Sequence, residues 1–403
     1  MIKRWTSYFS EMGPAWIVSA VACGPATLAS VSIAGASFGF ELSWVVVFSA
    51  VFGATAQYLA ARIGIIEGKG IISVTENRLG SLWGWLLAID ALLATTIASL
   101  VLMNALSGVT SLVAGVKSSW WGVAYAAFIS ASLIRGGYKW FENLCKLLVA
   151  FVVVCFIVTA VYIDIPLKSV IRGLVPAIPV GFESALMIAA IMGGAVHITI
   201  IAMHTYNTNL KKWTTADLGL ARFDNTLSMG FAFGLYSLAI FIVAAGVLHP
   251  NNIKIASATD AALSLGPLLG KKAMLVFLVG LWAATLSTIS PTFLATAYFV
   301  FDIMNWELDT RDKKFAYVIV ISTALSALGP LIKGSFFLLL PLMLALGLCG
   351  TPFILAIILY LLNKKEIVGE YRNSKVLNFL GVATLLVTTA IAVQFVLSRL
   401  SLV

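Results

Sequence analysis

The stretch SAVACGPATLAS, residues 19–30, places Gly24 and Pro25 in the middle of an apolar run that extends over residues 13–38. A helix that crosses a bilayer needs about 20 apolar residues, and this run is long enough. Proline removes a backbone donor and clashes with the preceding turn, so it interrupts a helix. Backbone groups freed at membrane depth are tolerated only where they are buried in protein or line a cavity. The stretch therefore predicts a broken membrane-spanning helix with a functional break.

The composition of the whole chain is that of a polytopic membrane protein. Of its 403 residues, 61% are hydrophobic and 11% are charged, and the mean hydropathy is +1.01, whereas soluble domains carry about a quarter charged residues. About eleven apolar runs are long enough to cross a bilayer; they cover residues 13–38, 43–66, 82–108, 118–135, 143–164, 184–206, 226–248, 272–302, 314–333, 335–363 and 377–399. We therefore expect an all-α integral membrane protein without a soluble domain large enough to hold an enzyme.

The basic residues predict the orientation of these helices. The net charge is +9, and when alternate loops are assigned to alternate sides, most Lys and Arg fall on the side of the N-terminus. The groups on that side are Lys3 with Arg4, Arg135 with Lys139, Lys211 with Lys212, Arg311 with Lys313 and Lys314, and Lys364 with Lys365. Cytoplasmic loops are enriched in Lys and Arg, so we expect a cytoplasmic N-terminus and an external C-terminus. The positive charge then serves topology and anionic lipid rather than nucleic acid.

A second interruption lies in the sixth apolar run. The stretch IMGGAVHITIIAMHT, residues 191–205, places Gly193 and Gly194 ahead of His197, and a glycine pair loosens a helix. Five helices after the first break, the chain enters the membrane from the opposite side, as in an inverted repeat, where paired breaks mark a carrier's binding site. For each break alone, a packing kink is the alternative. We expect one transmembrane transporter domain over 1–403, with repeats at 13–164 and 184–363 and an extra helix at 377–399.

Polar side chains gather around both breaks and in three other helices. They are costly inside a membrane and are therefore candidates for function. The candidates are Cys23, Thr27, Ser30, Ser32, Gln57, Arg62, Asp90, His197, Thr199, His204, Thr205, Ser287, Thr288 and Ser290. For each Ser and Thr the alternative is a hydrogen bond within its own helix, and for Arg62 it is snorkelling to the interface.

Three titratable residues have sharper alternatives. His197 follows the glycine pair near mid-depth, so it is either a ligand of the cargo or a satisfied core histidine. His204 lies two turns further along the same helical face and is either a step in a proton route or an interfacial residue. Asp90 is a carboxylate well inside a span, and it either relays protons or is paired with Arg62 or another polar group.

The sequence does not support several classes of chemistry. It has no nucleophile–base arrangement, and the string GKG at residues 68–70 lacks the spacing of a phosphate-binding loop. The four cysteines, Cys23, Cys145, Cys155 and Cys349, show neither a disulfide framework nor a metal-binding spacing. We therefore expect no enzyme activity, no cofactor and no direct coupling to ATP.

The first two apolar runs resemble those of the NRAMP family of divalent-metal transporters. The resemblance extends over residues 13–65 and is carried above all by the opening Gly-Pro and by QYLAARIGI at residues 57–65. Further similar segments are RGGYKWFENLCKLLVAF at 135–151, GLVPAIP at 173–179, RFDNTLSMG at 222–230 and LGPLLGKKAMLVFLVGLWAATLSTI at 265–289. The resemblance implies a LeuT-type fold with the first and sixth helices unwound at the substrate site, and secondary active transport by alternating access.

The chain departs from this family at the substrate site. Where the family has Asp-Pro-Gly-Asn, this chain has GPAT, so that Gly24 replaces the metal-binding Asp and Thr27 replaces the Asn. Where the family has Met-Pro-His-Asn, this chain has HITI, so that His197 stands at the metal-binding Met and Thr199 at the His. His204 matches a second family histidine that is linked to proton movement.

In the third helix the acidic proton-route positions of the family align with Leu92 and Thr95, out of register with Asp90. We expect substrate contacts at Cys23, Gly24, Ala26, Thr27, Gly194, His197 and Thr199, with Thr27 and His197 as the metal ligands if the cargo is a divalent cation. The candidate proton-coupling groups are His204, which matches the family histidine, and Asp90, which is a carboxylate inside a span.

The resemblance and the chemistry of the site lead to different cargoes. The family implies a divalent cation, and because a bare ion needs anionic or many oxygen ligands, the cation would keep part of its hydration shell. The lost carboxylate and the positive helix ends favour instead a small organic carboxylate or zwitterion. A sensor or scaffold without transport activity is the third hypothesis.

Overall fold

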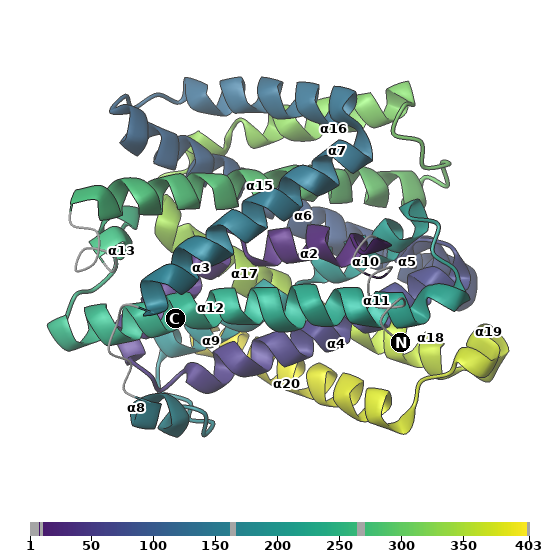
Figure 1. Cartoon of the computed structure of the whole chain (residues 1–403). Helices are drawn as coiled ribbons and strands as arrows, with labels where there is room; N and C mark the ends of the chain where they lie inside the picture. The colour runs from purple at the N-terminus through teal and green to yellow at the C-terminus, as the bar shows by residue number, and fades with distance from the viewer. Residues whose placement is uncertain (1–7, 9–10, 162–166, 264–270, 401–403) are drawn as a thin grey trace.

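The computed structural model describes residues 8, 11–161, 167–263 and 271–400, and this part of the chain is helical without strands (Figure 1). Within it, eight helices are long and apolar enough to cross a membrane, or nine when a bent first pair is counted as one span. The side chains of Cys145 and Cys155 lie outside the described part.

The first apolar run forms two helices, α2 (Pro14–Ala22) and α3 (Pro25–Phe38). Their axes differ by 45°. Each helix begins with a proline at its first position, where the missing N–H costs nothing because that group would have no helical partner. The break expected at Gly24-Pro25 is therefore confirmed.

The sixth apolar run is broken as well. Helix α9 (Phe182–Ala195) ends after the glycine pair, and α10 (Ile198–Leu210) begins immediately after His197. In the apolar 18-residue segment of this run, 94% of the residues are buried inside the protein. The corresponding share in the last helix of the chain is 28%. A helix that is apolar all round and buried all round is a central helix of the bundle.

The other apolar runs outside residues 118–164 coincide with single helices or continuous helical runs. These are α4 (Ser43–Glu67), α6 (Ser81–Ala114), α11 (Leu218–Asn225) with η2 (Thr226–Phe233), α12 (Gly234–Val243) and η3 (Ala244–Leu248), α15 (Lys271–Ile303), α16 (Lys313–Ser326), α17 (Phe336–Cys349) with α18 (Thr351–Asn363), and α20 (Lys375–Leu400). Short helices connect them: α5 (Ile71–Leu79), α8 (Leu167–Arg172), α13 (Ala258–Ala262) and α19 (Lys365–Val368).

The expected runs at 118–135 and 143–164 differ from the structure, because both fall within one helix, α7 (Trp120–Val161). The connection between them contains two glycines but no proline, and glycine weakens a helix by only about 1 kcal/mol per residue. Its 42 residues would span about 63 Å, twice the thickness of a bilayer core. Figure 1 shows how this length is accommodated, since α7 runs beside α16, changes direction and crosses the molecule diagonally over α12.

The broken helices lie in the middle of the bundle, with α16 and α20 on opposite outer sides (Figure 1). Helix α17 packs on α9 and α3, and α15 packs on α6 and α2. Large apolar side chains are exposed along the outer helices, for example Ile321 on α16 and Phe379 and Leu386 on α20. Such a surface is suited to lipid, whereas the two breaks are enclosed by protein.

Candidate substrate site between the two broken helices

The first break separates α2 from α3 by one extended residue. Gly24 has φ −74° and ψ 179°, and its N–H donates to the Val21 carbonyl at 3.1 Å. Pro25 has no N–H, and among the described residues the carbonyls of Ala22 and Cys23 accept no backbone hydrogen bond. The break therefore presents carbonyl oxygens at the end of α2 and amide groups, without a side-chain cap, at the start of α3.

Gly24 is closely surrounded. A Cβ at this position would overlap the hydroxyl of Thr288 and would lie 2.8 Å from the Val21 carbonyl oxygen. Thr288, on α15, donates its hydroxyl to the Ala284 carbonyl at 2.8 Å and lies 3.3 Å from the Ala20 carbonyl oxygen of α2. The Thr288 hydroxyl thus occupies the space that an aspartate at position 24 would need.

His197 caps the second half of the broken sixth helix. Its Nδ1 accepts a hydrogen bond from the Thr199 N–H at 3.2 Å, and its backbone is extended. A neutral imidazole whose Nδ1 accepts carries its proton on Nε2. The Nε2 edge lies against Gly347 of α17, where a Cβ would overlap the ring. In this conformation neither ring nitrogen offers a free lone pair to a cation.

Helix α17 closes the second break from the side. The Leu344 carbonyl lies directly over Gly193, where a Cβ would overlap it. The hydroxyl of Thr351, the first residue of α18, donates a hydrogen bond to the Val196 carbonyl. The two breaks also meet each other, since a Cβ at Gly194 would lie 2.5 Å from the Thr27 Oγ1. Small residues on the sixth helix therefore permit the close approach of two neighbours.

A small cavity lies between the two breaks, α6, α15 and α17. Its volume is about 30 Å³, which is room for about one water molecule. Its wall consists of Val21, Ala26, Ala98, Leu102, Gly194, His197, Thr199, Ile200, Thr288, Thr292, Met343 and Leu344. No residue of this wall carries a carboxylate, and the buried Thr199 hydroxyl has no hydrogen-bond partner among the described residues. The structure is thus closed around a site without fixed negative charge.

The structure brings most of the expected substrate residues to this cavity. Those in its wall are Ala26, Gly194, His197 and Thr199. Gly24 and Thr27 lie at the breaks beside it, against Thr288 and Gly194 respectively. Cys23 instead turns toward the Ser19 hydroxyl, with its Sγ at 3.9 Å.

Sequence reasoning missed the parts of the wall that come from α6 and α17. Ala98 and Leu102 on α6, and Met343 and Leu344 on α17, are apolar residues in apolar helices, so nothing in their pattern distinguishes them from lipid-facing positions. A usable signal was present on α17, where Gly347 and Gly350 stand one turn apart and receive the side chains of His197 and Asp90.

The two expected proton-coupling residues lie outside the cavity. His204 is fully buried on α10, and its Nε2 is 3.3 Å from the Asn225 Nδ2. Asp90 lies against Gly350, where a Cβ would be 2.5 Å from its carboxylate. The expected alternative of an Asp90–Arg62 pair is wrong, because the ion pair found in the described part of the chain joins Arg78 to Glu67.

Among the residues that the structure describes, no group of three His, Cys, Asp or Glu side chains is close enough to hold a metal ion. This agrees with the donor chemistry of the cavity wall. The side chains of the wall offer hydroxyl groups and one capped imidazole, whereas the side chains that hold divalent metals in proteins are mostly carboxylates, thiolates or free imidazoles.

Comparison with known proteins identifies the family. A family model described as "Natural resistance-associated macrophage protein-like" (Nramp) matches residues 15–398. The chain belongs to the Nramp family. The "Divalent metal cation transporter MntH" of Yersinia pestis (strain Pestoides F) is 28% identical over 409 residues, which cover 97% of this chain and 95% of that protein. The protein of the same name from Pectobacterium carotovorum is 29% identical over 290 residues, 69% of each chain.

Solved structures share the fold of this Nramp protein. A manganese transporter of Eremococcus coleocola superposes with a TM-score of 0.77 at 14% identity, over 96% of this chain and 86% of that one. Mhp1, a nucleobase-cation-symport-1 family transporter, gives 0.63 at 17% identity over 98% and 92%, and MhsT gives 0.63 at 15% identity over 95% and 98%. The LeuT-type fold expected for this protein is confirmed. The protein is a membrane transporter, and its relatives are transporters rather than enzymes.

Proposed function

We propose that this protein is a secondary transporter that works by alternating access and carries a small zwitterionic solute rather than a bare divalent metal ion. The observation that carries this proposal is the uncharged cavity between the breaks, in which the His197 Nδ1 is used as a helix cap. Removing a divalent ion from water is costly unless anionic groups or many oxygens replace its hydration shell. A metal-binding role for Thr27 and His197 therefore has little support in this conformation.

The helix ends at the breaks suit a molecule that carries both charges. Carbonyl oxygens at the end of α2 bear partial negative charge, and the uncapped amide groups at the start of α3 bear partial positive charge. A cationic group would interact with the first and a carboxylate with the second. The unpartnered Thr199 hydroxyl would supply a further hydrogen bond. A net-neutral solute with both groups then needs no charged side chain.

The same fold is compatible with organic cargo. Among the structural neighbours, MhsT was determined with L-phenylalanine and Mhp1 with bromovinylhydantoin. In this protein a cavity of about 30 Å³ must widen to admit such a molecule. Separation of α3, α9 and α17, which meet at Gly193 and Gly194, would provide that space.

A divalent cation that keeps its water shell is the second candidate. The observation that favours it is similarity along 97% of the chain to divalent metal cation transporters. Free carbonyls and hydroxyls would then accept hydrogen bonds from the water ligands. Asp90 and His204 remain the proposed proton-coupling groups for either cargo.

Binding measurements on the purified protein distinguish the two cargoes. Calorimetric titration with Mn²⁺ and Mg²⁺ is expected to give no saturable heat, whereas a panel of small amino acids is expected to contain a ligand that raises the unfolding temperature. Uptake of that ligand into proteoliposomes is then measured with a Na⁺ gradient, with a pH gradient and with neither, to identify the coupling ion. Saturable Mn²⁺ binding that is lost in His197→Ser would refute the zwitterion proposal, because serine keeps the helix cap but not the imidazole.

A further inference from the structure

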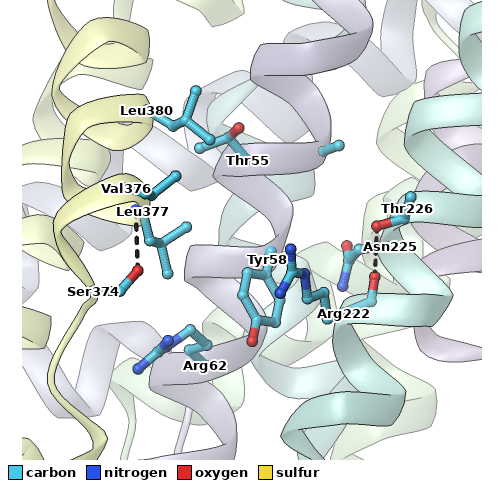
Figure 2. A pocket seen from close by; sticks show the side chains of 11 residues that line it. Thr55, Tyr58, Arg62, Arg222, Asn225, Thr226, Ser374, Val376, Leu377 and Leu380 are labelled. Carbon is cyan, nitrogen blue, oxygen red and sulfur yellow. Dashed lines mark hydrogen bonds between the residues drawn. The ribbon is translucent and has the colours of Figure 1, made fainter.

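A second, larger cavity lies away from the breaks, between α4, the junction of α11 with η2, and the start of α20 (Figure 2). Its volume is about 470 Å³. Its lining includes Arg62 near the end of α4, Arg222 on α11 and Ser374 just before α20. The charge distribution of the sequence predicts that this side of the bundle is cytoplasmic. Asn225 in its wall contacts His204 at 3.3 Å, but the cavity shares no lining residue with the small cavity between the breaks.

Two arginines give this cavity its positive charge. Arg62 is only 8% exposed, one guanidinium nitrogen donates to the Tyr371 carbonyl, and its Nε has no hydrogen-bond partner among the described residues. Arg222 also lines the cavity and is exposed. The ion pair found in the described part of the chain is Arg78–Glu67, so no described carboxylate neutralises either cavity arginine.

The rest of the cavity fits a headgroup at one end and a hydrocarbon chain at the other. Tyr58 of α4 lines the cavity, and the centroid of its ring lies 5.8 Å from the Arg62 guanidinium carbon. Ser374 accepts a hydrogen bond from the Leu377 N–H at 3.2 Å, which orders the first turn of α20 at the cavity edge (Figure 2). Beyond Ser374, the side of the wall formed by α20 is apolar and consists of Val376, Leu377 and Leu380, and the other side carries the hydroxyl groups of Thr55 and Thr226.

This apolar wall continues onto the outer surface of α20. Val376, Phe379 and Leu386 are 70%, 73% and 64% exposed, which in a membrane protein is the face presented to lipid tails. A soluble anion would need the arginines but not this wall. An amphiphile with a negative headgroup matches both.

We infer that this cavity is a binding site for one anionic phospholipid, whose phosphate lies between Arg62 and Arg222 and whose acyl chain follows Leu377 and Leu380 along α20. The planar guanidinium group binds phosphate through two parallel hydrogen bonds. Two guanidinium groups on different helices can therefore bind the same phosphate group from two sides. Basic pockets between transmembrane helices at the cytoplasmic side are suited to anionic headgroups. The site does not depend on the cargo proposed above.

Native mass spectrometry tests this inference. The intact protein, purified in detergent, is titrated with dioleoyl-phosphatidylglycerol, with dioleoyl-phosphatidylcholine, and with inorganic phosphate. We expect one saturable phosphatidylglycerol, at least tenfold weaker binding of phosphatidylcholine, and no retained inorganic phosphate. Equal binding of the two lipids would overturn the role of the arginines, and inorganic phosphate that displaces phosphatidylglycerol at equal concentration would overturn the assignment to lipid.

Variants locate the bound lipid. Arg222→Gln removes an exposed guanidinium and should weaken phosphatidylglycerol at least tenfold, or about 1.4 kcal/mol, without affecting folding. Arg62→Lys keeps the charge but loses the planar fork, and it should weaken binding as well. The matched control is Arg78→Gln, which removes an arginine already paired with Glu67 and should bind like the unaltered protein. Unchanged binding in Arg222→Gln, or an equal loss in Arg78→Gln, would refute the site, even if Arg62→Lys fails to fold.

Discussion

Gly347→Ala tests whether His197 serves as a helix cap held in place by α17. The added Cβ would overlap the imidazole at Nε2, Cδ2 and Cε1, so the ring must rotate and release the Thr199 N–H. Loss of an N-cap costs about 0.5–2 kcal/mol, and overpacking a tight core costs about 1–3 kcal/mol. We therefore expect Gly347→Ala to lower the free energy of unfolding by about 2–4 kcal/mol.

The assay is reversible unfolding of the purified protein in mixed micelles, with His197→Ser and the double variant measured in parallel. Serine retains a cap acceptor and vacates the space of the ring, so the double variant should be more stable than Gly347→Ala alone. Gly280→Ala on α15 is the matched control, because a Cβ there meets nothing within 4 Å. Unaltered stability of Gly347→Ala, or simple additivity in the double variant, would refute the packing of His197 against α17.

Three further predictions concern the neighbourhood of the site. Gly24→Ala should destabilise the protein by about 1–3 kcal/mol through contact with Thr288, and Thr288→Ala should restore part of that loss in thermal unfolding; a harmless Gly24→Ala would show that the break is wider than described. Thr199→Val should leave stability unchanged or raise it, since the lost hydroxyl has no partner, yet it should reduce solute uptake; undiminished uptake would remove Thr199 from the site. Asp90→Asn should flatten the pH profile of transport if Asp90 relays protons, and an identical profile would exclude the relay.

The positions of the breaks could be predicted from the sequence because their cause is local. Pro25 lacks a donor wherever it is placed, and Gly193 with Gly194 lowers helix stability whatever surrounds it. The apolar runs are equally local, since about 20 apolar residues must cross a bilayer as a helix. The continuous α7 differed from expectation because the connection between the two expected runs contains a glycine pair but no proline, and glycine weakens a helix without ending it.

The role of His197 could not be predicted from the sequence. An imidazole after a glycine pair is compatible with a metal ligand, a proton carrier or a cap, and the choice depends on Gly347, 150 positions further along the chain. The same holds for Arg62, for which a functional role and snorkelling were the two alternatives, and for Arg222, for which nothing in the sequence predicts a role. Their shared cavity exists only because α20 packs beside α4 and α11.

The sequence by itself determined that this protein is a membrane transporter with two broken helices, and it predicts a substrate site without the family's aspartate. Hydrophobicity, proline and glycine act over a few residues, so their consequences can be read along the chain. The tertiary structure decided which atoms face the cavity, because the direction of a side chain and the partner of a lone pair depend on helices that are distant in sequence. It is that packing which turns the His197 Nδ1 toward Thr199 and places uncharged side chains around the cavity.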